Sequence, residues 1–176
     1  RKHEDRYKQA AIDYPRKLHG DRKAYLYTKP FGTDPWGDDF CGKFHDFAHL
    51  VEMFRLPSGA SILDVGCGPG WLSEYFARLG YRATGIDISP DMIETARERI
   101  RCLGFPEGGK GIQASFAVMD SEGFQLDQQF DAAVVYDALH HFEDERAVLR
   151  TVFAHLKPGG RLFMKEPQAH HPDAPE

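Results

Sequence analysis

The sequence contains no long apolar run, no excess of basic residues and no leader peptide. A membrane-spanning helix needs about 20 consecutive apolar residues, and no stretch of the 176 residues approaches that length. Acidic residues outnumber basic residues by 27 to 22, which disfavours a nucleic-acid partner because phosphate contacts require a cationic face. No basic segment followed by an apolar core and a small-residue cleavage site marks an export signal. We therefore expect no membrane association and a cytoplasmic location.

Cysteine is also scarce, and its spacing excludes two kinds of cysteine site. The chain has three cysteines, Cys41, Cys67 and Cys102. They are widely spaced and include no CxxC pair, so they form neither a zinc knuckle nor a disulfide framework. His45 and His49 lie one helical turn apart, but Asp46 stands where a zincin motif requires glutamate. We therefore expect a reducing environment and no metal ion.

Apolar residues and glycine, by contrast, are plentiful enough for one folded domain. The AVILMFWYC set makes up 41% of the chain and there are 17 glycines, which is the ordinary globular level. A chain of this length forms one domain. Within it, we expect residues 1–56 to form an N-terminal helical cap and residues 57–176 to form the core.

Charge is distributed unevenly along the chain. Residues 1–23 are rich in lysine and arginine, whereas residues 120–145 contain eight acidic residues and no lysine or arginine. Two interpretations of the basic segment stay open: a solvated helix face, or a surface for a phosphate-bearing substrate or partner.

Strand and helix patterns alternate from Ser61 onwards, after a helical pattern at 44–55. Short apolar runs predict strands at 62–65, 82–87, 115–119, 132–135 and 161–165. Helical periodicity and capping residues predict helices at 71–79, 90–103 and 144–156. The K-P-G-G segment predicts a turn before the last strand. Strands that are apolar along their length are typical of parallel sheets covered on both faces, so we predict an α/β, Rossmann-like fold.

A glycine-rich turn follows the first predicted strand. The segment D-V-G-C-G-P-G occupies residues 64–70, and Gly66, Gly68 and Gly70 remove every second side chain. Backbone amides at the start of the next helix can then approach a ligand closely. The second predicted strand ends at Asp87, where an acid can hold two ribose hydroxyls. Together these features predict a nucleoside cofactor at the carboxyl edge of the sheet.

The glycine spacing does not fit the usual dinucleotide and triphosphate motifs. In a GxGxxG fingerprint that starts at Gly66, the third glycine would fall at Trp71, and in one that starts at Gly68 it would fall at Ser73. No Gly-Lys-Ser/Thr follows a glycine loop, as a Walker motif requires. A nicotinamide or nucleotide enzyme on the same kind of sheet is therefore a disfavoured alternative.

Five segments, in order along the chain, carry a family resemblance. They are I-L-D-V-G-C-G-P-G-W-L-S around the glycine loop, Y-R-A-T-G-I-D-I-S-P-D-M-I at 81–93, and the segments 116–122, 130–144 and 156–163. Each resembles a motif of the class I S-adenosylmethionine-dependent methyltransferases, of the small methyltransferase type 11 kind. The resemblance implies a sheet of strand order 3-2-1-4-5, S-adenosylmethionine as cofactor and S-adenosylhomocysteine as product.

The resemblance also implies roles for the residues of the first two motifs. Asp64 orders the loop and the methionine amino group, directly or through water. The three glycines admit the methionine part of the cofactor, and Cys67 supplies a small side chain between them. Asp87 accepts hydrogen bonds from the ribose hydroxyls, and Ile88 flanks the adenine. A simpler interpretation of Asp64, as a cap of the following turn, stays open.

The later motifs imply the rest of the cofactor site. Asp120 accepts from the exocyclic amine of adenine, with the backbone of Ser121 nearby, and Tyr136 begins the loop over the methionine and the reactive methyl. A plain turn residue is the alternative for Asp120. These positions complete the set of cofactor-binding residues that the resemblance implies.

Catalysis by such an enzyme depends on alignment more than on reactive side chains. The methyl group of a sulfonium is already activated, so positioning alone can supply about 7–11 kcal/mol of the barrier. A general base is optional and depends on the acceptor. His140 and His141, just past the fourth predicted strand, are candidates for the base or for lining the cofactor; Tyr136 and Asp137 are further candidates for the base.

The chain departs from the family pattern at its C-terminal end. The family's sheet has seven strands, but only about ten residues follow the fifth predicted strand here. We therefore expect a natural chain that continues past Glu176 to a C-terminal hairpin, and an exposed edge at 162–164 in this chain.

The predicted function is methyl transfer from S-adenosylmethionine to a small-molecule acceptor. We expect the acceptor atom to be oxygen, which follows from how often this family methylates oxygen. Two alternatives stay open: a catalytically incomplete, cofactor-binding or regulatory domain of a larger protein, and an RNA or protein methyltransferase anchored by its basic N-terminal segment. The sequence by itself defines no oligomeric state.

Overall fold

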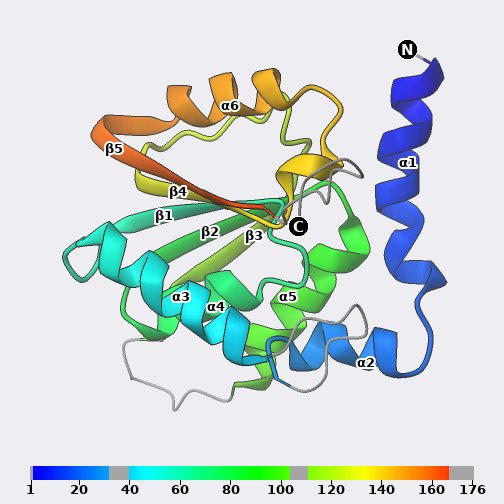
Figure 1. Ribbon diagram of the computed structural model, residues 1–176, viewed down its shortest axis with the longest axis horizontal. Coiled ribbons are helices and arrows are strands. Elements are labelled where there is room, and N and C mark those ends of the chain that lie inside the picture. The colour runs from blue at the N-terminus through cyan, green and yellow to red at the C-terminus, as the bar shows by residue number, and fades with distance from the viewer. Residues whose placement is uncertain (1, 32–39, 104–110, 167–176) are drawn as a thin grey trace, which may run out of the picture.

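A five-stranded parallel sheet forms the centre of the fold in the computed structural model, which describes residues 2–31, 40–103 and 111–166 (Figure 1). Its strands follow the order β3-β2-β1-β4-β5, which confirms the predicted order 3-2-1-4-5. The strands are β1 Ser61–Val65, β2 Arg82–Asp87, β3 Ala114–Val118, β4 Phe130–Tyr136 and β5 Leu156–Lys165. The helices are α1 Lys2–Lys17, α2 Asp21–Thr28, α3 Phe40–Phe54, α4 Trp71–Arg78, α5 Pro90–Cys102, η1 Leu139–His141 and α6 Glu145–Ala154.

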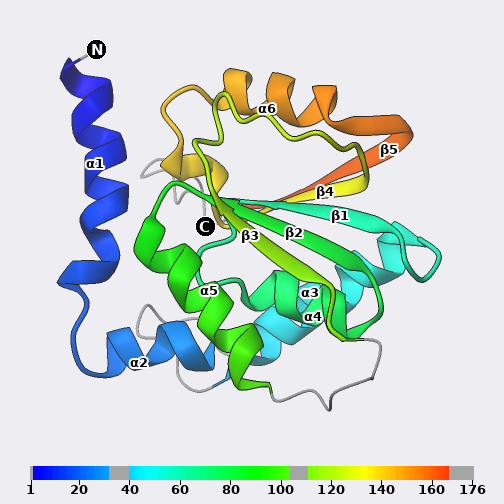
Figure 2. The ribbon, with the colours of Figure 1, turned by 180° about the vertical axis from the view of Figure 1, so that it is seen from behind.

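Helices cover both faces of this sheet, as Figures 1 and 2 show from opposite sides. On one face, α3 and α4 pack through Phe54 and Phe76 against Ile62 of β1. On the other face, Val148 of α6 packs against a cluster that includes Leu63. All five residues of β1 are buried, which agrees with its continuous apolar pattern. The central strands therefore anchor the turn that follows each of them.

The N-terminal helices α1 and α2 lie against α5 (Figure 2). Leu18, Leu26 and Met92 form a small apolar cluster between them. The buried guanidinium of Arg99 in α5 forms an ion pair with Glu74 of α4, at 2.8 Å. It also donates hydrogen bonds to the carbonyl oxygens at the end of α2, which belong to Leu26, Tyr27 and Lys29. One buried side chain thus joins α2 to the core.

Two boundaries differ from the sequence-based expectations. The predicted turn at 157–160 lies inside β5, because Leu156 already pairs with Phe130 and pairing resumes at Arg161 after an irregularity in the register. Gly159, with φ of 80°, permits that irregularity. Residues 24–43, in which two prolines and three glycines predict an irregular stretch, contain the C-terminal half of α2 and the start of α3, while residues 32–39 lie outside the described residues.

Two further expectations concern membranes and the sheet edge. No helix in the described parts of the chain has the length and apolar character needed to cross a bilayer. Among the described residues β5 is an edge strand, and Met164 within it is 51% exposed. The predicted exposed edge at 162–164 is thus present.

Candidate cofactor and active site

The glycine loop between β1 and α4 is held against the end of β2. The amides of Gly66 and Cys67 both donate to the carbonyl oxygen of Ile86, at 2.9 and 3.0 Å. Gly68 and Gly70 have φ of 52° and 72°, a region that favours glycine. These contacts fold the loop back over the carboxyl edge of the sheet.

The glycines of this loop serve different purposes. A Cβ on Gly70 would lie 2.7 Å from Cβ of Ala96 and 2.8 Å from the ring of Phe116, so this position must lack a side chain for the loop to pack. A Cβ on Gly68 would meet nothing within 4 Å. The backbone at Gly68 therefore faces open space, as a ligand-binding turn requires.

Asp87 at the end of β2 connects the glycine loop to the start of α5. Its Oδ2 accepts from the amide of Gly68 at 2.9 Å, and its Oδ1 accepts from the amide of Ser89 at 2.8 Å. Burial raises the pKa of Asp87, while these two hydrogen bonds act in the opposite direction. Each carboxylate oxygen has a further lone pair, so the group can still accept from hydroxyls. The adjacent Ile88 is partly buried.

Asp64 is a buried carboxyl group on the same edge, 2% exposed. Its Oδ2 accepts a hydrogen bond from Oγ of Ser73 at 2.7 Å. Burial raises its pKa to about 6, an effect that Asp87 reinforces and that Ser73 and Lys29 oppose. A buried and a half-buried carboxylate beside one glycine loop favour a ligand with positive charge, because buried charges are stable when they are paired.

Asp120 lies just past β3 and is bound by the N-terminal helix. Nζ of Lys8 in α1 lies 2.6 Å from Oδ2 of Asp120 and 2.7 Å from Oε2 of Glu122. Partial burial by itself would lower the pKa of Lys8, but the two acids outweigh this effect and raise it. The neighbouring Ser121 is 3% exposed. Helix α1 therefore lies beside the position expected for the adenine.

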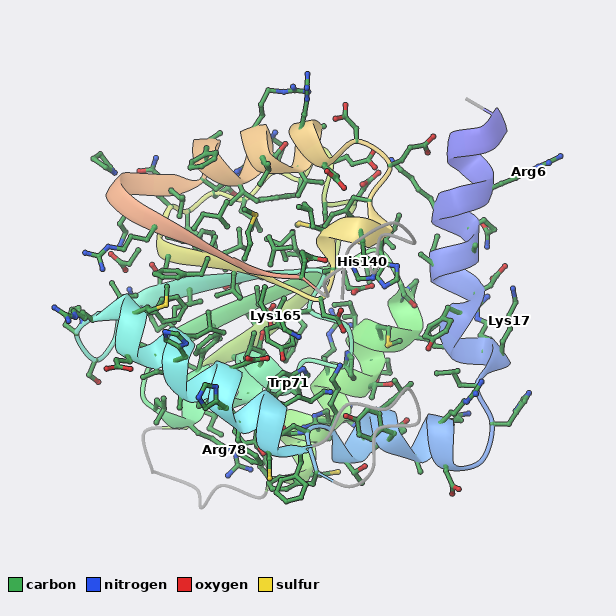
Figure 3. All side chains as sticks on the ribbon, viewed as in Figure 1. Arg6, Lys17, Trp71, Arg78, His140 and Lys165 are labelled. Atoms are coloured by element: carbon green, nitrogen blue, oxygen red, sulfur yellow. The ribbon has the colours of Figure 1, made fainter. Side chains whose placement is uncertain are left out.

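Tyr136 ends β4 within a cluster of aromatic and charged side chains. Its hydroxyl donates to Oδ2 of Asp46 at 2.7 Å, and its ring lies 5.5 Å from that of Trp71. Nζ of Lys165 lies 5.0 Å from the centre of the same ring and 3.6 Å from Oδ2 of Asp46. Figure 3 labels Lys165, Trp71 and His140 near the carboxyl ends of the strands. This cluster forms a wall beside the glycine loop.

His140 and His141 occupy the short helix η1 after β4. Nδ1 of His140 lies 2.6 Å from Oε2 of Glu166. Partial burial and the neighbouring His140 lower the pKa of His141, against the effects of Asp137 and Glu166. The segment lies over the glycine loop, because a Cβ on Gly66 would come within 2.8 Å of Ala138. Both histidines are thus on the edge that carries Asp64 and Asp87.

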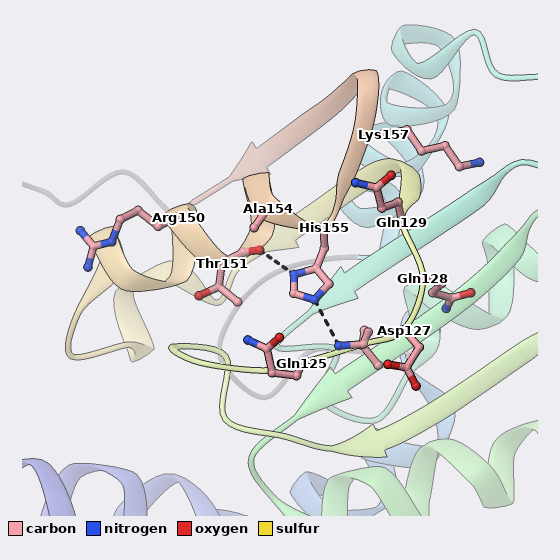
Figure 4. Close-up of a pocket in the computed structure, with 10 residues that line it drawn as sticks. Gln125, Asp127, Gln128, Gln129, Arg150, Thr151, Ala154, His155 and Lys157 are labelled. Atoms are coloured by element: carbon pink, nitrogen blue, oxygen red, sulfur yellow. Dashed lines mark hydrogen bonds between the residues drawn. The ribbon is translucent and has the colours of Figure 1, made fainter.

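A separate hollow among the described residues lies elsewhere on the molecule (Figure 4). This cavity of about 700 Å³ is next to the amino ends of β4 and β5. His155 in its wall has both ring nitrogens engaged: Nδ1 donates to the carbonyl of Thr151 at 2.8 Å, and Nε2 accepts from the amide of Leu126 at 3.1 Å. Ligands of parallel sheets bind at the carboxyl ends of the strands, so we assign the site to the glycine loop.

Comparison with known proteins agrees with this geometry. A family described as "Methyltransferase domain" matches residues 62–160, which is more than half of the chain. The chain belongs to this methyltransferase domain family. The match includes the glycine loop, Asp87, Asp120 and the segment with His140 and His141, so the predicted site residues of the methyltransferase domain lie within the matched region.

Curated relatives and solved structures agree with the family. The domain is 40% identical over 126 residues to a ubiquinone biosynthesis O-methyltransferase of Xanthomonas axonopodis pv. citri, covering 66% of this chain and 50% of that protein. It thus spans about half the length of the curated relatives it matches.

Two solved structures illustrate the shared fold. Magnesium protoporphyrin IX methyltransferase from Synechocystis PCC 6803 with bound SAM aligns with a TM-score of 0.67 and 25% identity, over 85% of this chain and 72% of that one. A SAM-dependent methyltransferase from Thiobacillus denitrificans, in complex with S-adenosylhomocysteine, aligns with a TM-score of 0.59 and 27% identity, over 84% and 56%. The methyltransferase domain therefore has the Rossmann-like class I fold.

Three contacts of this site were not predicted from sequence. They are the ion pairs of Lys8 with Asp120 and Glu122, the bond between Tyr136 and Asp46, and the contact of His140 with Glu166. The complementary charges of residues 1–23 and 120–145 are a signal that could have indicated the first. The other two join residues 90 and 26 positions apart, and no local pattern marks them.

Proposed function

We propose that this methyltransferase domain transfers the methyl group of S-adenosylmethionine to an oxygen atom of a small-molecule acceptor. The observation that carries the proposal is the buried carboxylate of Asp64 and the half-buried carboxylate of Asp87, on either side of a glycine loop with open space at Gly68. The 40% identity to a ubiquinone biosynthesis O-methyltransferase supports oxygen as the acceptor atom.

The residues present fit S-adenosylmethionine. Asp64 would hold its cationic amino group, since an ionised carboxylate buried without a cation is unfavourable. Asp87 would accept from the ribose hydroxyls with the lone pairs that Gly68 and Ser89 leave unused. The glycines and Cys67 would admit the methionine part, and Ile88 would flank the adenine.

The outer part of the site would hold the adenine and close over the methionine. Asp120 would accept from the exocyclic amine, sharing its carboxylate with Lys8, and the backbone of Ser121 would lie beside the ring. Tyr136, whose hydroxyl is fixed by Asp46, would border the methionine. When bound, the cofactor supplies a sulfonium methyl that a nucleophile can displace in line with the sulfur.

The acceptor needs alignment and, if it is a hydroxyl, a place for its proton. The wall formed by Trp71, Tyr136 and Lys165 would orient an aromatic or anionic acceptor. His140 is our candidate for the base, because it lies on the same edge and reaches solvent with 43% of its side chain exposed. His141 would line the cofactor.

Two alternatives make different predictions. An RNA methyltransferase needs a cationic face, but Lys8 and Arg16 of α1 are paired with Asp120, Glu122 and Asp91, so we do not favour it. A cofactor-binding or regulatory domain would bind S-adenosylmethionine without transferring its methyl group.

We also propose that residues 1–56 form the cap over the acceptor. We further propose that the protein works without a metal ion, in a reducing cytoplasm.

A transfer assay tests the proposal. The protein is incubated with radiolabelled S-adenosylmethionine and, separately, with catechol, 1,2-phenylenediamine or a mixed RNA. We expect label in catechol alone, and loss of the label in Asp87→Asn. Label in the diamine or the RNA would overturn the oxygen or small-molecule assignment. Binding without transfer, in the full-length protein as well, would favour the regulatory alternative.

A further inference from the structure

One carboxylate holds the segment that follows β4. Glu166, the residue after β5, accepts with Oε1 from the amides of Ala138 and Leu139, at 3.1 and 2.8 Å. Its other oxygen, Oε2, lies 2.6 Å from Nδ1 of His140. The amide of Asp137 also donates to the carbonyl of Lys165 at 2.7 Å. The whole segment 137–140 is thereby tied to the end of β5.

The charge of Glu166 defines the direction of its bond to His140. Burial by itself would raise the pKa of Glu166, but the hydrogen bonds from His140, Leu139 and Ala138 outweigh it and lower that pKa. The group is therefore an ionised carboxylate at neutral pH, and an ionised carboxylate only accepts hydrogen bonds. Nδ1 of His140 must then carry the hydrogen, which leaves the lone pair of the neutral ring on Nε2.

We propose that Glu166 is a positioning residue of the methyl transfer, which fixes His140 in the tautomer whose Nε2 accepts the proton of the acceptor. This inference rests on the proposed function and adds a residue outside the segment 62–160 that matches the family. Holding the loop in place would require only Oε1, which binds the two backbone amides. Oε2, which contacts the imidazole of His140, additionally fixes the orientation of the ring and the nitrogen that carries the hydrogen.

The step that Glu166 assists moves one proton and two electron pairs. The O–H bond of the acceptor breaks and its proton moves to Nε2 of His140. The oxygen electron pair forms the new O–CH₃ bond, while the electrons of the broken C–S bond pass to sulfur. The imidazolium that results is paired with the Glu166 carboxylate through Nδ1, and its proton leaves to water through the exposed side of the ring.

Glu166→Gln is the variant that separates this role from a structural one. The amide oxygen of glutamine can keep both backbone bonds, to Ala138 and Leu139. Its NH₂ group then faces Nδ1 of His140 and can only donate to it. The variant should therefore keep the loop in place and invert the tautomer, so that Nε2 carries the hydrogen and has no lone pair for the proton of the acceptor.

The direct test is nitrogen NMR of the histidine rings in the 176-residue chain, with the His140 signals assigned from their loss in His140→Asn. In the unaltered protein, at an alkaline pH that keeps the imidazole ring neutral, we expect a protonated Nδ1 and an unprotonated Nε2. In Glu166→Gln the two signals should exchange, while the backbone amide signals of Ala138 and Leu139 stay near their positions. The control is Glu145→Gln, an exposed glutamate in the first turn of α6, which should leave the ring unchanged.

Turnover provides a second measurement, with catechol as the probe acceptor. We expect Glu166→Gln to lower kcat about 10²-fold, within the usual range for general-base catalysis, and to leave KM for S-adenosylmethionine unchanged. With a nitrophenol that is already ionised at the assay pH, the loss should disappear, because no proton has to move. An equal loss with both acceptors would overturn the inference.

The outcomes also distinguish this inference from the function on which it rests. A hydrogen on Nε2 of the neutral His140 ring in the unaltered protein overturns the inference, and this result does not depend on whether the variant folds. An unchanged tautomer in a folded Glu166→Gln does the same. A protein that fails to bind S-adenosylmethionine in a calorimetric titration, whatever the tautomer, overturns the proposed function instead.

Discussion

Asp64→Asn should stabilise the protein at neutral pH, although it removes a charge from the proposed binding site. The pKa of the buried Asp64 is raised from 3.8 to about 6. A carboxyl group whose pKa is higher in the folded state binds more protons there, so the free energy of unfolding falls as the pH rises from about 4 to 6. At about 1.4 kcal/mol per pH unit the ionised group costs the fold about 3 kcal/mol above pH 6.

Urea denaturation of both proteins at several pH values measures this difference. We expect Asp64→Asn to exceed the unaltered protein by up to about 3 kcal/mol in free energy of unfolding at pH 7.5. The gap should close as the pH falls to 4, where Asp64 is protonated. The same substitution should weaken S-adenosylmethionine binding, because a neutral amide cannot pair with the cofactor's amino group. Equal stability at pH 7.5 would refute the reasoning.

Asp131→Asn is the matched control, with the opposite sign. Partial burial by itself would raise the pKa of Asp131, but hydrogen bonds from Lys157 and Ser61 outweigh this effect and lower the pKa to about 2. Its stabilising effect is therefore complete above about pH 4 and is lost as the pH falls through 2. This substitution should lower the free energy of unfolding at pH 7.5 by about 1 kcal/mol. A higher free energy of unfolding in Asp131→Asn would show that Asp64 and Asp131 do not have the opposite pKa shifts described here.

Three further substitutions test the packing of the glycine loop and of α2. Gly70→Ala should destabilise the protein by about 2 kcal/mol or more in urea titrations, because the methyl would meet Ala96 and Phe116 at under 3 Å; Gly68→Ala, with open space, should cost less and mainly weaken cofactor binding. Arg99→Met should cost about 3 kcal/mol, because Glu74 would keep only the more exposed Arg78 as a partner and the carbonyls at the end of α2 would lose their donor. Hydrogen exchange should speed up in α2, and unchanged exchange there would contradict this prediction.

The regular part of the fold was predictable because local patterns determine it. Apolar runs marked β1, β2 and β4 to within two residues, and the helix predicted at 90–103 is α5, which Ser89 caps by accepting from the amide of Met92. The glycine loop and Asp87 were also identified from sequence, by their residue types and spacing, whereas the hydrogen bond from the Gly68 amide to Asp87 is seen only in the structure. The roles in cofactor binding that we infer from the family resemblance stay predictions until ligand binding is measured.

Contacts between distant segments were not predictable. Asp46 was considered only as the residue that breaks a zincin motif, whereas in the structure it accepts a hydrogen bond from Tyr136. Glu166 follows an edge strand and carries no local motif, yet it contacts three consecutive residues of another loop. The basic N-terminal segment was interpreted as a solvated face or a phosphate-binding surface, but Lys8 and Arg16 pair with acids of the core. Such contacts depend on three-dimensional packing.

The most direct test of the central claim is a calorimetric titration of the protein with S-adenosylmethionine, beside Asp87→Asn as the variant. The account predicts saturable one-to-one binding by the unaltered protein. It also predicts affinity at least about 10-fold lower in the variant, since a hydrogen bond to a charged group contributes about 1.5–3 kcal/mol. Circular dichroism would establish that both proteins are folded. Equal affinity in the two proteins, or no binding by the folded unaltered protein, would contradict the assignment of the cofactor site.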